Sequence, residues 1–181
     1  MIPTEDEIKK LWEKYQLPRQ KRVHVELVAR VAMALANYFP VDKKLLFAAA
    51  LLHDIDKAAP KLPGERHPDA AVRILREEGM NEVADVVRTH PLHAILNPTI
   101  CPTTWEQKLL YLADKMVKYE IIGVDRRFAL WRDEHLSKDV QHVIDECYPK
   151  VKKLEQEVFN IAGISFDDIK NSRTFSSAKS A

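Results

Sequence analysis

Apolar side chains recur every three or four residues along most of this chain, which is the spacing of helices that bury one face. Over residues 22–38, for example, Val28, Val31 and Leu35 fall on one such stripe. The sequence contains no run that clearly alternates apolar and polar residues, as a half-buried strand would. The pattern therefore predicts an all-α fold, a compact helical bundle of roughly seven to ten helices.

Local signals indicate where these helices begin and end. Thr4 and Glu7 have the spacing of a capping box that opens the first helix, and Pro18 closes it. Asp42 is the expected N-cap of a helix that ends near His53. Further helices are expected over about 22–38, from a cap at His67 to Gly79, and from a cap at Asn81 to His90. A capping box of Thr103 and Glu106 is expected to open a helix that runs to about Ile121. Three more are expected over 126–134, over 137–161 with a break or a kink at Pro149, and from Ser165.

Composition is that of one globular domain. The chain has 181 residues, 46% of them hydrophobic and 30% charged, which is enough to bury a sizeable core. Its 4 glycines are too few for a turn-rich β architecture. Neither a repeat nor a linker divides the sequence. We expect a single domain over residues 1–170, followed by a small polar tail at 171–181 that is disordered.

Charge and cysteine content argue against several classes of partner. The 28 basic and 27 acidic residues give a net charge of +1, which does not indicate binding to a nucleic-acid duplex. Cys101 and Cys147 form no CxxC motif, so no disulfide framework or thiolate zinc site is predicted. The apolar run Leu45–Leu52 is too short to span a membrane, and the polar N-terminus is unlike a signal peptide. We therefore expect a soluble cytoplasmic protein.

Four predicted helices each carry a side chain that can bind a metal, on or at the end of the apolar stripe. These side chains are His24, His53 with Asp54 attached, His90 and Asp114. A single histidine on an apolar face is usually a core residue with one satisfied hydrogen bond. A carboxylate such as Asp114, however, is almost never buried unless it is paired or bound to a metal. The joint pattern predicts a metal site, and imidazole and carboxylate ligands suit Mn, Fe, Co, Ni or Zn.

The series His24 … His53-Asp54 … Asp114 resembles the H…HD…D motif that defines the HD-domain metal-dependent phosphohydrolases. The likeness covers about residues 20–120 and includes the phrases Leu-Leu-His-Asp-Ile-x-Lys and Tyr-Leu-Ala-Asp-Lys. It implies an all-α fold of the HD type and hydrolysis of a phosphate ester or anhydride by metal-activated water. By position, these four residues would hold the first ion.

Family members with two ions add two histidines between the HD pair and the last aspartate, and His67 and His90 occupy matching positions. Asp54 would then bridge both ions. The resemblance thus implies one or two divalent ions per chain, and it does not distinguish Mn, Fe, Co, Ni, Zn and Mg. The order H…HD…H…H…D is similar to the branch that hydrolyses symmetrical dinucleoside tetraphosphates. This chain departs from that branch in its short loop before His67 and in the Lys-Met-Val-Lys-Tyr after Asp114.

Several basic residues are candidates for binding a substrate phosphate. Lys57, one turn beyond His53, is the first of these, and with Asp54 it is also a candidate for a catalytic role. A solvated lysine at a helix C-terminus explains its position equally well. Three further phosphate candidates, each of which could equally be a solvated surface charge, are Lys115, Arg126 and Arg127.

Two other groups of residues leave alternatives open. His93, three residues past His90, could replace it as a ligand or face the substrate. Phe128, Leu130 and Trp131 are expected in the core or at a dimer face rather than in a platform for base stacking, so a homodimer stays open.

Two functions are compatible with these residues. An enzyme that hydrolyses a nucleotide or another small phosphorylated substrate is favoured, because every implied ligand is present. A sensor module that binds a nucleotide and keeps the metal site without efficient turnover is the alternative. A helical scaffold without a metal is disfavoured for the same reason.

Overall fold

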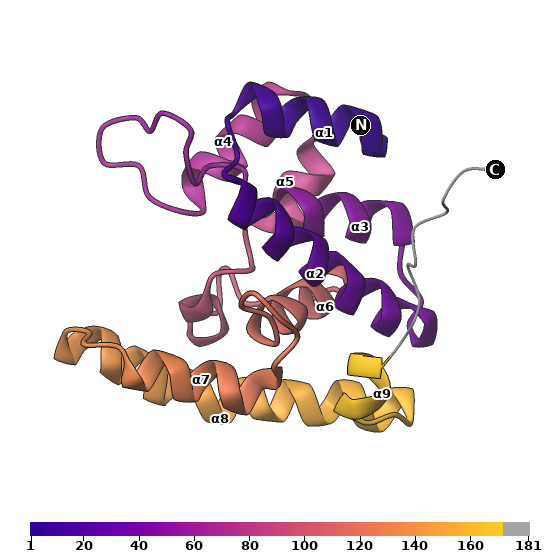
Figure 1. The fold of residues 1–181 in the computed structure, drawn as a ribbon, viewed down its shortest axis with the longest axis vertical. Coiled ribbons are helices and arrows are strands. Elements are labelled where there is room, and N and C mark those ends of the chain that lie inside the picture. Colours follow the sequence, from indigo (N-terminus) through magenta and orange to yellow (C-terminus); the bar gives the residue numbers. More distant parts are fainter. Residues whose placement is uncertain (172–181) are drawn as a thin grey trace.

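The computed structural model describes residues 1–171, and in that range it contains nine α-helices, two short 3-10 helices and no strand (Figure 1). The all-α prediction is confirmed. The elements are α1 (Glu5–Lys14), α2 (Arg19–Leu35), η1 (Ala36–Tyr38), α3 (Lys43–Leu52), α4 (Asp69–Glu77), α5 (Asn81–Val87), η2 (Leu92–Leu96), α6 (Trp105–Lys115), α7 (Gly123–Asp133), α8 (Lys138–Ala162) and α9 (Phe166–Asn171).

Helix α3 lies at the centre of the bundle and contacts α1, α2, α5 and α6. From Ala48 to Leu52 every residue of α3 is buried, so the helix is apolar on all sides rather than on one stripe. The three consecutive alanines 48–50 have short side chains, which lets the surrounding helices approach closely. α7 and α8 form a separate layer beneath this core, and α9 returns to contact α2 (Figure 1).

Several predicted helix ends are confirmed. Thr4 and Glu7 form the expected capping box, and the Asp42 carboxylate accepts hydrogen bonds from the backbone N–H groups of Lys44 and Leu45 at 2.9 and 3.0 Å. α4 is followed by Gly79 in a left-handed conformation (φ 76°), which suits the residue after a helix end. The expected break at Pro149 does not occur, since Pro149 lies inside the single helix α8.

Other predicted starts are wrong by a few residues. α2 begins at Arg19, three residues early, because Pro18 serves as its N-cap instead of ending only the preceding helix. The second capping box is formed by Thr104 and Gln107, not by Thr103 and Glu106, since glutamine accepts the same backbone N–H bonds. The N-caps of α4 and α5 also differ from the predicted ones by one residue. Pro68 is the N-cap of α4 in place of His67, and Met80 is the N-cap of α5 in place of Asn81.

α6 ends at Lys115 rather than near Ile121. The carbonyl of Met116 accepts backbone hydrogen bonds from Ile122 and Gly123 at 2.9 and 3.0 Å, which folds residues 116–122 into a tight loop. Gly123 has a φ of 80°, and a Cβ there would lie 3.2 Å from the ring of Phe166. The loop leaves Asp114 in the last turn of α6 and turns the backbone of Lys118 toward α2.

Two remaining predictions concern the chain ends and membranes. Asn171, predicted as the first residue of a disordered tail, is the last residue of α9, and the rest of that predicted tail lies outside the described residues. Among the helices of residues 1–171, none has the length and apolar character needed to cross a membrane.

Candidate metal centre

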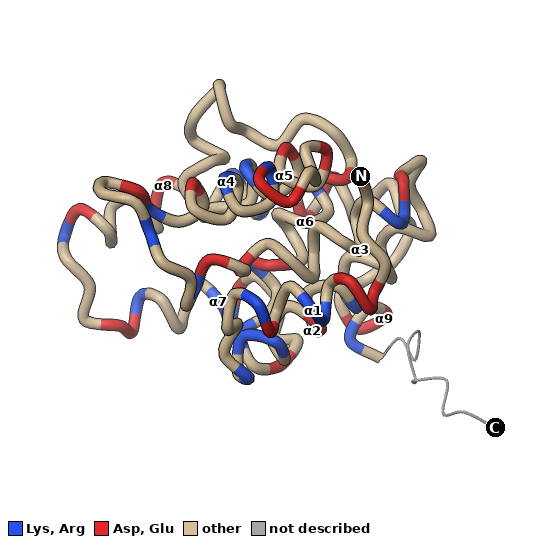
Figure 2. Tube along the Cα trace, turned by 90° about the horizontal axis from the view of Figure 1, so that it is seen from above, with Lys and Arg blue, Asp and Glu red and all other residues tan. Residues whose placement is uncertain are grey.

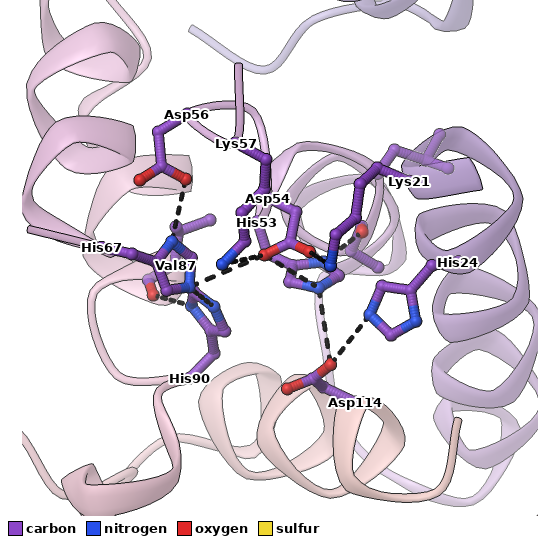
Figure 3. Close-up of polar contacts among 12 residues, drawn as sticks. Lys21, His24, His53, Asp54, Asp56, Lys57, His67, Val87, His90 and Asp114 are labelled. Carbon is purple, nitrogen blue, oxygen red and sulfur yellow. Dashed lines mark hydrogen bonds and ion pairs between the residues drawn. The ribbon is translucent and has the colours of Figure 1, made fainter. Parts of the chain in front are cut away.

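The side chains predicted to bind metal come from five helices or their ends and point toward one another (Figure 3). Most of them lie at or just beyond a helix end, where a side chain can turn toward a common centre. His24 comes from within α2, His53 and Asp54 follow α3, His67 precedes α4, His90 follows α5, and Asp114 lies in the last turn of α6.

Three of the histidines use Nδ1 to donate a hydrogen bond to a backbone carbonyl. For His24, His53 and His90 these carbonyls are those of Lys118, Ala50 and Val87, at 3.0, 2.8 and 2.5 Å. A carbonyl oxygen can only accept, so Nδ1 carries the proton in each ring. In the neutral imidazole, Nε2 then has a free lone pair, which is the arrangement found in histidines that ligate metals.

His67 is oriented in the same way by a carboxylate. Its Nδ1 lies 2.8 Å from Oδ1 of Asp56, which is completely buried. Pairing of a ligating histidine with a carboxylate fixes the ring and makes Nε2 a better donor to a metal. All four histidines therefore direct Nε2 toward the same centre.

The first group of ligand atoms surrounds Asp114. Nε2 of His24 and Nε2 of His53 lie 3.1 and 3.6 Å from Oδ1 of Asp114, and the three ligand atoms are within 4.8 Å of one another. Nε2 of His53 is buried and has no hydrogen-bond partner within the described part of the chain. A buried polar atom without a partner is unfavourable, and a cation at this point would satisfy it.

The second group surrounds Asp54. One ligand atom each from His53, Asp54 and His90 again lies within 4.8 Å of the others. Nε2 of His67 lies 3.6 Å from Oδ1 of Asp54 and only 2.9 Å from Nε2 of His90. Because both rings donate through Nδ1, these two facing nitrogens need a cation, either a proton or a metal ion, between them or beside them. Both groups thus fit a divalent metal by donor type and by placement.

Cations compensate the two carboxylates. Burial by itself raises the pKa of Asp54, but His53 and the ammonium groups of Lys57 and Lys21, at 3.3 and 2.9 Å, outweigh it and hold that pKa well below its usual value. Burial likewise raises the pKa of Asp114, and Lys115, at 2.6 Å, is the largest influence that lowers it again. Both carboxylates are ionised and ready to bind a cation.

The histidines respond differently to burial. Burial lowers the pKa of His53, but the charges of Asp54 and Asp114 outweigh it and raise that pKa above its usual value. The pKa of His90 is well below its usual value, first because of burial and then because the neighbouring rings of His53 and His67 disfavour a further positive charge. His90 is therefore neutral at physiological pH, as a ligand must be.

Apart from the fully buried His53, the predicted ligands line the floor of a cavity of about 450 Å³. Of the predicted phosphate candidates, Lys57 and Arg127 line this cavity, whereas Arg126 is exposed outside its lining. Lys115 also lines it but is 2% exposed and donates hydrogen bonds at 2.6 Å to the carbonyl of His90 and to Asp114, so it braces the floor. The exposed side chain of His93, the alternative ligand, lines the cavity as well.

Two residues of this site escaped the sequence reasoning. Lys21 contacts Asp54 at 2.9 Å, and its signal was its position one helical turn before His24 on the same face. Asp56 positions His67, and its only signal was a second aspartate two residues after Asp54. The aromatic prediction was right in part, since Phe128 is fully buried, but Trp131 is half-buried and also lines the cavity.

Comparisons with known proteins identify relatives of this chain and its family. The tRNA (cytidine(56)-2'-O)-methyltransferase of Picrophilus torridus is 28% identical over 158 residues, which cover 81% of this chain and 43% of that protein. The protein of the same name from Thermoplasma volcanium is 27% identical over 182 residues, covering 93% and 51%. The chain thus spans about half the length of these curated relatives. No solved structure gives a significant match. The HD domain model matches residues 23–118, more than half of the sequence, and the chain belongs to the HD domain family.

Proposed function

We propose that this chain is a metal-dependent phosphohydrolase that acts on a nucleotide or a related phosphate ester or anhydride. The observation that carries the proposal is the convergence of four histidine Nε2 atoms and two ionised carboxylates at the floor of a cavity whose walls are basic. Imidazole and carboxylate ligands hold hydrolytic divalent metals, and basic walls suit a phosphate.

The two groups of ligands have separate roles in this proposal. One ion would be held by His24, His53, Asp54 and Asp114, and a second by Asp54, His67 and His90. A bound divalent ion supplies a lowered pKa for water and neutralises phosphoryl oxygens. Oδ1 of Asp54 faces both groups, at 3.6 Å from Nε2 of His67 and 4.0 Å from Nε2 of His53, which supports its role as the shared ligand.

Two lysines complete the machinery on the cavity side. The ammonium groups of Lys21 and Lys57 reach the carboxylate of Asp54 from the cavity wall. There they are placed to bind phosphoryl oxygens of a substrate whose reacting phosphorus lies over the floor. Lys57 remains in contact with solvent, so its role as a solvated lysine is the alternative to phosphate binding.

The names of the relatives bear on substrate and on reaction type. They denote methyl transfer to tRNA by proteins about twice as long as this chain. Here residues 1–171 form no sheet, and the four glycines stand far apart, so this described part shows neither element of the usual α/β nucleotide-binding unit. We therefore assign to it the phosphate chemistry of the metal site and leave methyl transfer to the part of the relatives that it does not match.

A phosphate carried by RNA is the second candidate substrate, which the names of the relatives favour and which goes beyond the expected small phosphorylated substrate. Basic and acidic positions are interspersed along the described trace (Figure 2), which does not by itself indicate a duplex-binding face. An RNA end that enters the cavity would need no such face. A nucleotide sensor with an intact metal site stays the alternative to turnover of either substrate.

Turnover measurements test the proposal. The purified protein is incubated with Mn, Co, Ni, Mg or Fe and with para-nitrophenyl phosphate, its bis-ester, a broad nucleotide panel, and RNA oligonucleotides ending in a 5'-, 3'- or 2',3'-cyclic phosphate. We expect metal-dependent release of phosphate or of a nucleotide from at least one member, abolished by EDTA. A protein that binds metal and nucleotide but turns over no member of the panel would favour the sensor and contradict the proposal.

A further inference from the structure

One wall of the metal-site cavity comes from residues outside the segment that the HD domain model matches. Tyr119, from the loop after α6, and Arg127, Trp131 and Glu134, from α7 and its C-cap, line this wall. The floor, by contrast, is formed mostly from residues within 23–118. Since the family match ends before this wall, the wall is where the substrate preference particular to this chain is expected to lie.

Arg127 lines the cavity, and one hydrogen-bond donor of its charged guanidinium is unpaired within residues 1–171. Its Nε is buried and has no hydrogen-bond partner among the described residues. Glu134, an acidic residue in the same wall, lies 3.7 Å from the ammonium of Lys118. A buried donor without a partner is costly, so an anionic ligand that accepts from Arg127 would bind with a corresponding gain.

Trp131 holds the guanidinium of Arg127 in place. The central carbon of the guanidinium lies 4.2 Å from the centroid of the Trp131 ring, one helical turn along α7. The ring in turn packs edge-to-face on the fully buried Phe128, with centroids 5.0 Å apart at 83°. A guanidinium stacked on a ring keeps its N–H edges free, and these match two oxygens of a phosphate.

Tyr119 adds an aromatic ring near the mouth of the cavity. Tyr119 is 59% exposed, which is high for a large hydrophobic residue, so its position is not explained by packing in the core. Nucleobases stack on aromatic side chains and on guanidinium planes. The same wall therefore offers an anion-binding group and flat surfaces for stacking.

We propose that Arg127, Trp131 and Tyr119 form a subsite for the part of the substrate that is not cleaved, and that this part is a nucleoside with a second phosphate group. Arg127 binds the oxygens of that phosphate, and the ring of Trp131 fixes the orientation of the guanidinium. The base stacks on the aromatic side chains of this wall. The inference rests on the proposed function, because it assumes that the reacting phosphate lies over the metal ligands.

Equilibrium binding tests the subsite without turnover. The full chain, as purified, is titrated with the α,β-methylene analogues of ADP, GDP, CDP and UDP, whose bridging carbon resists hydrolysis, and with inorganic methylenediphosphonate, which lacks a nucleoside. Tryptophan fluorescence and calorimetry are the readouts. At least one nucleotide should bind roughly tenfold more tightly than methylenediphosphonate and change the fluorescence. The fluorescence change should disappear in Trp131→Phe and persist in Trp105→Phe, whose ring does not line this cavity.

Two substitutions of Arg127 separate charge from shape. Arg127→Gln and Arg127→Lys should each bind the best analogue about tenfold or more weakly, because lysine keeps the charge but loses the stacked fork. Arg126→Gln, at the exposed neighbouring position, is the control and should bind like the native chain. Circular dichroism confirms that each variant folds.

Three results would overturn the subsite: no analogue binds better than methylenediphosphonate, Arg127→Lys binds as tightly as Arg126→Gln, or Trp131→Phe keeps the fluorescence change. Each concerns binding alone. Failure of the phosphohydrolase proposal would instead appear as nucleotide binding without turnover, so the two failures are distinguishable.

Discussion

The buried carboxylate of Asp56 holds Nδ1 of His67 at 2.8 Å across an 11-residue separation in the chain. This contact fixes the imidazole whose Nε2 faces Asp54 and His90. Asp56 is not itself one of the residues that line the cavity, so it acts by positioning His67, which is.

Asp56→Asn should weaken binding of the second metal ion by about 10–100-fold, the usual effect of losing a carboxylate behind a ligating histidine. Affinity for the first ion should change little, because His24 and Asp114 do not contact Asp56. Calorimetric titration with Mn measures both sites. Asp69→Asn, at an exposed position at the start of α4, is the control. Equal affinities in Asp56→Asn and the control would show that the pair has no positioning role.

Removing the second ligand pair should convert the centre to one ion. The double variant His67→Ala, His90→Ala should keep one metal per chain and lose most of its activity, because His24, His53, Asp54 and Asp114 remain. His93→Ala should do much less damage, since the structure places the Nε2 atom of His90, not that of His93, against Nε2 of His67. Metal analysis and turnover of the two variants decide the matter, and a larger loss in His93→Ala would reverse the assignment.

The loop before His67 depends on Arg73. Its guanidinium binds Glu65 through two hydrogen bonds, at 2.8 and 3.0 Å, and the carbonyl of Pro60 at 3.2 Å. Arg73→Ala should loosen residues 58–66 and raise their amide hydrogen exchange. It should lower the affinity for the second metal ion by roughly tenfold and leave the affinity for the first ion unchanged. The matched control is Arg76→Ala on the same helix. If the loop exchanges alike in both variants, Arg73 does not hold it.

The cysteines should differ in reactivity. Cys147 is fully buried, and burial raises the pKa of its thiol to about 11. A raised pKa keeps the thiol protonated below that value, so at pH 8 only about one thousandth is thiolate. A thiol reagent should therefore modify the half-buried Cys101 in the native protein at pH 8, and Cys147 only after unfolding. Rapid modification of both thiols in the native protein would be inconsistent with this packing.

Most of the fold could be predicted from the sequence because the signals for helices are local. Apolar spacing and capping residues predict the helices, and the errors lie at ends where a neighbour takes the cap, as Gln107 does for Glu106. The early end of α6 could not be read from periodicity. It depends on Gly123 and on Phe166, which are far apart in the sequence and meet only in the folded chain.

The site was predictable where the ligands fall on helical stripes and harder to predict elsewhere. His24 and Asp114 lie on buried faces, so their spacing reveals them. Asp56 would point away from Asp54 if α3 continued, but α3 ends at Leu52 and the chain turns, with Lys57 N–H bonded to the carbonyl of Asp54 at 3.1 Å. The turn brings Asp56 to His67, a contact that no periodic pattern encodes.

The central claim, that the converging histidines and carboxylates form a metal centre shared through Asp54, is tested most directly by metal analysis of Asp54→Ala beside the native chain. After dialysis against excess Mn and removal of free ion, the native protein should retain one or two ions per chain. Asp54→Ala should retain none and have no activity, with its helical circular dichroism preserved. A native chain that retains no metal, or an Asp54→Ala variant that keeps its metal and full turnover, would contradict the account.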